Sequence, residues 1–185
     1  MTTDLKIDIY QEQERVKKEI VAQGLRVLVC TGTGCIANGS LKVIEKFKEL
    51  GVNVSALTDY DKMTIVPTGC HGFCEQGVLV IIPEKHTAYV KVKEEDVEEI
   101  YNSHIVGGKP VERLLYVDPL TNEHVHKSED INFYAKQVRT ALENCGHINA
   151  ECLDEAISVH AYEALFNILK ENNPDKVIEE MKNQT

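Results

Sequence analysis

The sequence lacks tryptophan, and it has few aromatic residues, few prolines and no long hydrophobic run. Aromatic residues make up 6% of the 185 residues, and there are 5 prolines. No apolar run approaches the roughly 20 residues that a helix needs to cross a bilayer. The first residues, through Gln23, also lack the continuous apolar stretch of a secretory signal. We therefore expect a cytoplasmic globular protein with no membrane span.

Positive charge is also scarce. There are 20 Lys and Arg against 30 Asp and Glu, so the formal net charge is -10. Proteins that bind phosphate backbones or anionic lipid need a basic surface. This composition excludes nucleic acid and anionic membranes as expected partners.

Cysteine is the residue type in surplus. Six cysteines are present, and a disulfide framework is a poor explanation for them in a chain without a secretory signal. The first four form two spaced pairs, Cys30-x4-Cys35 and Cys70-x3-Cys74, and the last two, Cys145 and Cys152, form a looser pair. Metal or redox chemistry is therefore the leading hypothesis.

The first two thirds of the chain carry the pattern of a small α/β domain. After an amphipathic helix over 10–21, the apolar periodicity changes between helical and extended spacing. The succession of strands and helices predicts a mixed sheet with flanking helices. The predicted elements are a strand over 26–30, a loop over 31–39, a helix capped by Ser40 and stopped by Gly51, strands over 52–57 and 63–66, a hairpin of 78–82 with 88–92, and a helix over 94–101.

The last third reads as a linker and an all-helical segment. Residues 118–132 are polar and contain Asp-Pro, which is typical of a linker. Beyond them, apolar residues recur at helical spacing. The predicted helices cover 133–143, about 149–157, about 162–170, and a stretch opened by Asn173 and Pro174.

The spacing of the first four cysteines excludes several metal sites. Zinc ribbons place two cysteines two residues apart, and a thioredoxin-type redox pair needs Cys-x-x-Cys, whereas neither loop has that spacing. A plant-type ferredoxin loop fails because residue 38 is Asn. The pattern that remains is a 2Fe-2S cluster held by Cys30, Cys35, Cys70 and Cys74. A zinc-stabilised docking module without redox activity is the alternative, and a dithiol-disulfide enzyme is a weaker one.

Glycines surround these cysteines. Gly32, Gly34, Gly69 and Gly72 lie inside the two loops. Because glycine lets the backbone approach closely, these four residues are candidates for contacts between the backbone and the cluster, with N–H groups that would tune it. Thr31, Thr33 and Thr68 are candidate hydroxyl donors.

These motifs closely resemble the thioredoxin-like 2Fe-2S ferredoxin domain. The matching stretches are 29–35 (Val-Cys-Thr-Gly-Thr-Gly-Cys) and 67–74 (Pro-Thr-Gly-Cys-His-Gly-Phe-Cys), followed by Glu-Gln-Gly-Val-Leu-Val. The version most similar is the amino-terminal part of the NAD(P)H-oxidising flavoprotein subunit of electron-bifurcating and NADP-reducing iron-only hydrogenases, which are relatives of the complex I flavoprotein subunit. The resemblance continues through residues 108–115 and resumes at 144–146.

This resemblance implies a division of the chain and a set of partners. It implies an N-terminal helical extension over 1–24, a thioredoxin-like ferredoxin domain over 25–117, a linker over 118–132 and, over 133–185, the start of an FMN- and NAD(H)-binding domain. FMN and NAD(P)H are expected only in a missing downstream part or in partner subunits. The expected partners are other subunits of a multi-subunit oxidoreductase, such as a hydrogenase, and ferredoxin-type electron carriers.

Other residues carry no comparable signal. Cys145 and Cys152 are expected to be ordinary side chains, because two thiols alone do not complete a cluster site. His71, between the ligands Cys70 and Cys74, is expected to be a polar loop residue. No catalytic acid-base pair is present, and we therefore expect no substrate active site in these residues.

Overall fold

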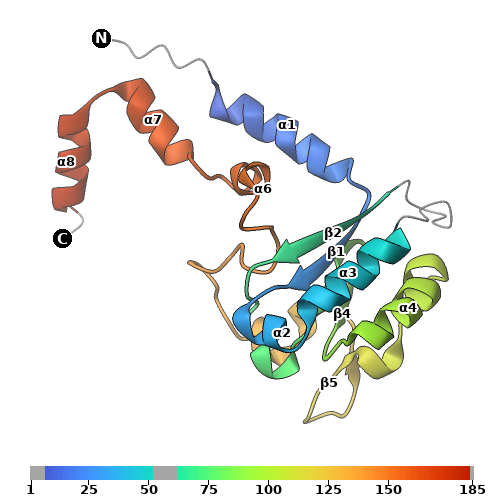
Figure 1. Cartoon of the computed structure of the whole chain (residues 1–185). Coiled ribbons are helices and arrows are strands. Elements are labelled where there is room, and N and C mark those ends of the chain that lie inside the picture. Colours follow the sequence, from blue (N-terminus) through green and yellow to red (C-terminus); the bar gives the residue numbers. More distant parts are fainter. Residues whose placement is uncertain (1–6, 52–61, 184–185) are drawn as a thin grey trace. The chain divides into compact units, whose positions relative to one another are not determined.

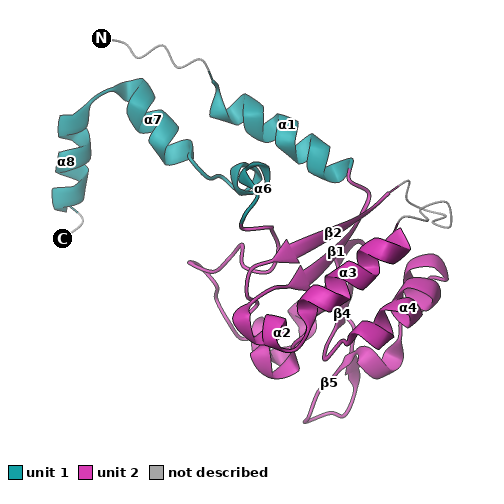
Figure 2. Cartoon of the chain, viewed as in Figure 1, with its two compact units in different colours: residues 1–22, 151–185 teal, residues 23–150 magenta. Residues whose placement is uncertain are grey.

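The structure is a computed structural model that describes residues 7–51 and 62–183 (Figure 1). Its contacts divide the chain into two compact units, one of residues 23–150 and one of residues 1–22 with 151–185 (Figure 2). No helix among the described residues is long and apolar enough to cross a membrane. The strand predicted over 52–57 lies outside the described residues.

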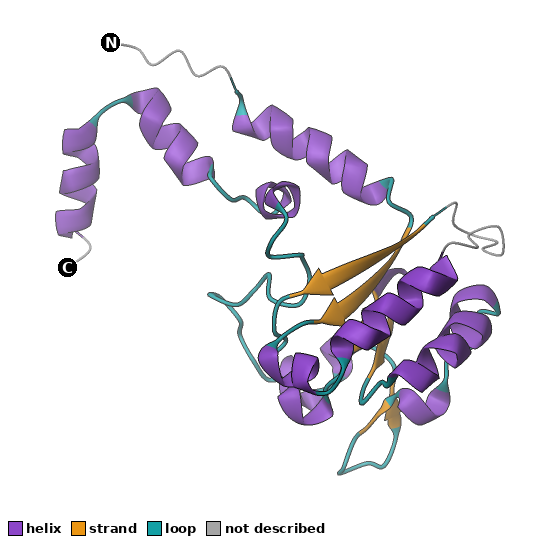
Figure 3. Ribbon diagram, in the orientation of Figure 1, coloured by secondary structure: helices purple, strands orange, loops and turns teal. Residues whose placement is uncertain are grey.

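A four-stranded mixed sheet forms the centre of the unit 23–150 (Figure 3). The strand order is β2-β1-β3-β4, with β1 parallel to β2 and antiparallel to β3. The predicted hairpin is confirmed, since β3 and β4 pair with Val80 opposite Tyr89. The strands are β1 Leu25–Cys30, β2 Met63–Thr68, β3 Val80–Ile82 and β4 Thr87–Tyr89.

The strand β2 runs past Pro67, where the sequence predicted that it would end. Pro67 lies opposite Val29 in the register, and the ladder continues to Thr68 opposite Cys30. Proline has no N–H to donate, but β2 is at the edge of the sheet, where one side of a strand needs no partner. The prediction of a stop was therefore wrong, and the extra residue brings Thr68 level with Cys30.

Side chains along β1 point alternately to the two faces of the sheet, so the core has two sides. Val27 and Val29 pack with Phe47 of α3, Ser40–Gly51, whereas Cys30 packs in a separate cluster that includes Phe73. Figure 1 shows α3 lying across β1 and β2, next to α4, Val97–Glu99. The last residue of β1 therefore points away from α3, toward the side where the later part of the chain covers the sheet.

The helix predicted over 94–101 is longer than expected. It begins with a 3-10 turn, Glu94–Asp96, continues through α4 and ends in a wide π-type segment, Ile100–Val106. Inside it, His104 is buried and its Nδ1 lies 2.7 Å from the hydroxyl of Tyr89 in β4. That side-chain contact ties the helix to the sheet.

Residues 107–150 belong to the same unit as the sheet. A short hairpin pairs β5, Tyr116–Val117, with β6, His124–Val125. The predicted helix over 133–143 is wrong: only α5, Asn132–Ala135, is helical, and residues 136–150 form turns. Phe133 stacks on Phe73 at 4.5 Å between ring centroids, and Arg139 donates to the carbonyl of His71. These contacts favour an irregular path over helical periodicity.

The second unit consists of helices from both ends of the chain. The prediction of α1, Ile9–Val21, is confirmed, with Asp8 as its N-cap. Val16 of α1 is 1% exposed, and Gln13 donates to Glu163 at 2.6 Å. The later helices are α6 Leu153–Ser158, α7 Glu163–Glu171 and α8 Pro174–Asn183, and they match the last three predicted helices within a few residues.

Candidate metal centre

The first cysteine pair lies at the end of β1 and in the short helix that follows it. Cys30 is the last residue of β1 and is 1% exposed. The stretch predicted as a loop instead contains the helix α2, Thr33–Ala37, which carries Cys35 on its buried face at 2% exposure. The turn of helix that begins at Thr33 brings the Cys35 thiol back toward Cys30, close enough to lower the pKa of Cys30.

The second pair lies in the loop that follows β2. Cys70 and Cys74 are both exposed, and their Sγ atoms are 4.0 Å apart. Metal–thiolate bonds of about 2.3 Å at a tetrahedral ion place two sulfurs about 3.8 Å from each other. The spacing of this pair therefore fits two ligands on one iron.

The two pairs meet at one end of the sheet. Both Cys35, in the helix after β1, and Cys70, in the loop after β2, lie close enough to Cys30 to lower the pKa of its thiol. The hydrogen bond from Cys35 lowers the pKa of Cys30 to about 6, while the same bond and burial raise the pKa of Cys35. A lowered pKa favours the thiolate, which is the form that binds metal.

Backbone N–H groups are directed at these sulfurs. The backbone N–H groups of Gly32 and His71 help to lower the pKa of Cys30, and the N–H of Gly72 donates to the Cys70 sulfur at 3.3 Å. The backbone of Leu79, at the start of the hairpin, does the same for Cys35. Hydrogen bonds to cluster sulfurs stabilise negative charge and set the reduction potential. The contributions of His71 and Leu79 were missed, because main-chain donors carry no sequence signal.

Glycine is needed at some of these positions and not at others. A Cβ at Gly32 would lie too close to the Cys70 sulfur, at 3.0 Å, whereas one at Gly34 would make an ordinary contact of 3.7 Å with the Cys74 sulfur. A Cβ at Gly69 would meet nothing within 4 Å, so the protein atoms around it do not require glycine, and its contact with the cluster stays a prediction. The closest approach to a thiol belongs to Gly77, which lies beside the second loop: a Cβ there would lie 2.7 Å from the Cys35 sulfur.

Two of the threonines do not serve the sulfurs. The Thr31 hydroxyl donates to the carbonyl of Thr68 at 2.7 Å, and the Thr68 hydroxyl donates to the carbonyl of Val29 at 3.4 Å. The expectation that these hydroxyls donate to the cluster was wrong. They instead join the ends of β1 and β2, and so hold the two cysteine loops side by side.

His71 is more than a polar loop residue. Its side chain is 2% exposed, and burial, with the nearby His147 and Arg139, lowers its pKa to about 4. Gly146 lies so close to its ring that a Cβ there would collide with it. Residues 139–147 therefore pack directly behind the loop that carries Cys70 and Cys74.

The remaining cysteines do not belong to this set. Cys145 belongs to the unit 23–150, where it lines a small cavity with Gly69, and Cys152 is the N-cap residue of α6 in the other unit. Over residues 7–51 and 62–183, no three His, Cys, Asp or Glu side chains are placed to hold a single metal ion. A zinc site needs four ligands around one ion, whereas a 2Fe-2S cluster takes two thiolates on each iron. The paired arrangement of the thiols fits the cluster.

Comparison with known proteins identifies the family. The sequence profile of the thioredoxin-like [2Fe-2S] ferredoxin family matches residues 16–104. A 2Fe-2S ferredoxin of Aquifex aeolicus is 38% identical over 81 residues, which are 44% of this chain and 71% of that protein. A 2Fe-2S ferredoxin of Clostridium pasteurianum is 34% identical over 43% of this chain and 76% of its own length.

Solved structures of relatives are also similar. The crystal structure of the wild-type thioredoxin-like [2Fe-2S] ferredoxin from Aquifex aeolicus is 33% identical in sequence, with a TM-score of 0.44. The aligned region covers 49% of this chain and 93% of the ferredoxin chain. The extent of the sequence match carries the assignment: this chain belongs to the thioredoxin-like [2Fe-2S] ferredoxin family.

Proposed function

We propose that this chain is the electron-transfer module of an NAD(P)H-oxidising flavoprotein subunit, of the kind found in electron-bifurcating iron-only hydrogenases. The observation that carries the electron-transfer part is the convergence of four thiols, of which Cys30 and Cys35 are buried and Cys70 and Cys74 are exposed. A centre with one exposed side can exchange electrons with a docked partner, while its buried side is held rigidly by the sheet.

The residues of this chain hold the centre and set its charge. Cys30, Cys35, Cys70 and Cys74 would be the ligands. When bound, a 2Fe-2S cluster supplies one-electron transfer. The backbone N–H groups of Gly32, His71, Gly72 and Leu79 favour negative charge on the ligand sulfurs.

The assignment to a flavoprotein subunit rests on residues outside the family match. Residues 105–185 follow the matched stretch. Of these, residues 105–150 pack into the ferredoxin unit, and the helices α6, α7 and α8 belong to the other unit. In the proposed subunit these helices begin the domain that binds FMN and NAD(H). Partner subunits and ferredoxin-type carriers in the cytoplasm would then exchange electrons with the centre from the side on which Cys70 and Cys74 are exposed.

The test is to ask whether a pyridine nucleotide reduces the cluster in the assembled complex. The chain is tagged in its native host and purified anaerobically with whatever binds it. Bound FMN is measured, and the 2Fe-2S signal is followed by electron paramagnetic resonance after addition of NADH or NADPH. We expect FMN in the complex and a cluster that either NADH or NADPH reduces, whereas the isolated chain is reduced by dithionite alone.

A complex without FMN, whose cluster neither nucleotide reduces, would contradict the flavoprotein assignment. It would leave the ferredoxin assignment intact, because reduction by dithionite tests that separately. The same purification with Cys70→Ala is the control, since this variant should still assemble but should lack the reducible signal.

A further inference from the structure

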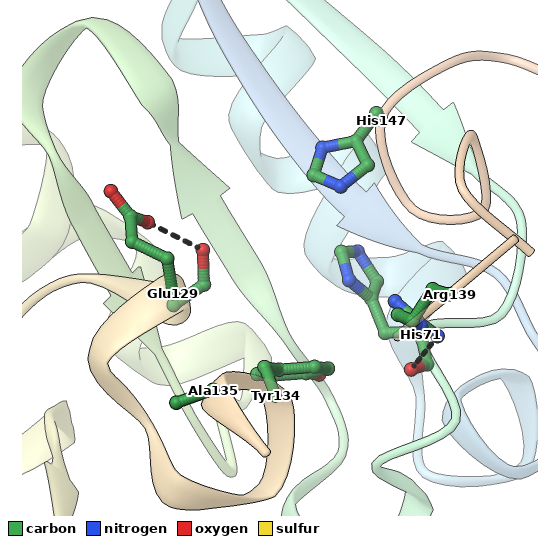
Figure 4. A pocket seen from close by; sticks show the side chains of 7 residues that line it. His71, Glu129, Tyr134, Ala135, Arg139 and His147 are labelled. Carbon is green, nitrogen blue, oxygen red and sulfur yellow. Dashed lines mark hydrogen bonds between the residues drawn. The ribbon is translucent and has the colours of Figure 1, made fainter. Parts of the chain in front are cut away.

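A cavity lies behind the loop that carries Cys70 and Cys74. Its volume is about 270 Å³, and it is formed wholly by residues of the unit 23–150 (Figure 4). His71 and Arg139 lie on one side, with His147 beyond them, and Glu129 and Tyr134 face them across the space. The family match covers residues 16–104, so His71 is the one residue named here that lies inside it, and the rest of the wall is built by later residues.

Three polar atoms around this cavity are buried and have no hydrogen-bond partner. They are Nε2 of His71, the hydroxyl oxygen of Tyr134 and Nε of Arg139. His71 is 2% exposed and lines the cavity, so its ring is held in place by the groups packed around it. Leaving a buried polar group without a partner costs free energy, and three such groups around one cavity indicate an occupant that satisfies them.

The free groups favour an acceptor as that occupant. Arg139 is fixed, since its Nη2 donates to the carbonyl of His71 at 2.7 Å and its guanidinium lies 5.5 Å from the Tyr134 ring centroid. Its Nε–H, the Tyr134 hydroxyl and the Ser128 hydroxyl are all donors. Guanidinium groups bind carboxylate and phosphate oxygens especially well.

Glu129 is the group in the wall that would repel an anion. Glu129 is exposed, and its carboxylate accepts from the Ser128 hydroxyl at 3.3 Å. A side chain in contact with solvent can turn outward, which frees the Ser128 hydroxyl for a ligand. The charge that then faces the pocket is that of Arg139, which is half-buried, in a chain whose net charge is -10.

We propose that this pocket binds a small oxyanion, with Arg139, Tyr134, His71 and Ser128 as the groups that receive it. The ligand would carry a carboxylate or a phosphate group, because the oxygens of either group can accept hydrogen bonds from several fixed donors at once. This proposal does not depend on which protein exchanges electrons with the centre, because the pocket is formed by residues of the unit 23–150 alone.

The test is a calorimetric titration of the full chain, with its cluster, at constant ionic strength in chloride. Inorganic phosphate is the probe in one arm and acetate in the other, which separates the two kinds of group. We expect saturable binding at one site per chain in at least one arm. Tyr134→Phe removes one donor but keeps the ring, and should weaken binding severalfold; Arg139→Gln should weaken it at least tenfold.

Lys42→Gln is the matched control, because it also removes one positive charge but lies on α3, away from the cavity. Its affinity should stay within twofold of the wild type. If neither probe binds saturably, water fills the cavity and the proposal is overturned. It is equally overturned if Lys42→Gln weakens binding as much as Tyr134→Phe, since the anion would then bind through general charge. Should Arg139→Gln fail to fold, Tyr134→Phe and Ser128→Ala decide the question.

Discussion

At the scale of residues, the four thiols of the candidate centre are not equivalent. Cys30 and Cys35 are buried by the sheet and α2, whereas Cys70 and Cys74 are exposed on a loop. The spacing of the cysteines predicts the two pairs from the sequence alone. It does not predict the N–H group of Leu79, which reaches Cys35 only because β3 lies beside β1.

Removing one exposed ligand should abolish the centre without unfolding the chain. In Cys74→Ala, we expect iron per chain and visible absorption to fall by more than half, because three thiolates cannot complete the coordination of the two irons. Cys152→Ala is the control, since Cys152 lies in the other unit. Iron analysis and absorption spectra of both variants are the measurement. Equal loss in both variants would mean that the ligands are assigned wrongly.

The close approach of Gly77 to the Cys35 sulfur gives a second prediction at this scale. In Gly77→Ala, the new Cβ would lie 2.7 Å from that sulfur, with little space to relax. Overpacking of this kind costs about 1–3 kcal/mol in the free energy of unfolding. Gly69→Ala should be nearly neutral, because its Cβ would meet nothing within 4 Å. Urea unfolding of the two variants is the measurement. Equal stability of Gly77→Ala and Gly69→Ala would contradict this account of Gly77.

At the scale of elements, the sequence predicts what depends on local pattern and misses what depends on contacts. The strand β1, the helix α3 and the hairpin follow from apolar periodicity and were confirmed. The helix predicted over 133–143 has the right periodicity, yet Val138 is 95% exposed and the chain turns at residue 136. Stacking on Phe73 and the bond to His71 decide that segment, and neither partner is near in sequence.

The contact between His104 and Tyr89 predicts how stability depends on pH. Tyr89 accepts a hydrogen bond from the N–H of Val111 at 3.0 Å, so its own proton is free for Nδ1 of a neutral His104. Burial, with smaller effects of Lys85 and His126, lowers the pKa of His104 from 6.5 to about 4. Between these values the unfolded chain takes up a proton that the folded chain does not. The free energy of unfolding therefore falls as the pH is lowered through this window, by up to about 1.4 kcal/mol per pH unit.

The variant His104→Gln isolates this effect from the other titrating groups. We expect the wild type to lose more stability than the variant between pH 6.5 and pH 5, and the two to have parallel profiles above pH 7.5. Urea unfolding across this range is the measurement. Parallel profiles over the whole range would show that His104 does not stay neutral in the folded chain.

At the scale of the whole molecule, the candidate centre is built by one of the two units. All four thiols and their N–H donors lie within residues 23–150, whereas α1 and the last three helices form the other unit. The contacts of Tyr10 and Gln13 with α7 join residues about 150 positions apart, as the pairs Tyr10–Asn167 and Gln13–Glu163 show. Sequence pattern gives each of these helices but not their pairing.

A charge placed inside the helical unit should therefore leave the metal centre unchanged. Val16 is 1% exposed, and α1 packs against α6. In Val16→Asp, an unpaired buried carboxylate should loosen this packing. We expect amide hydrogen exchange in α1, α6 and α7 to accelerate at least tenfold, while iron content and absorption stay at wild-type values. Loss of iron in this variant would contradict a centre held by residues 23–150 alone.

The central claim is that Cys30, Cys35, Cys70 and Cys74 hold a 2Fe-2S cluster. Electron paramagnetic resonance of the anaerobically purified, dithionite-reduced chain tests it most directly. We predict a rhombic S = 1/2 signal that persists at temperatures where the signals of four-iron clusters broaden, and that disappears in Cys74→Ala. A colourless protein with no signal, containing zinc or bare thiols, would contradict the account.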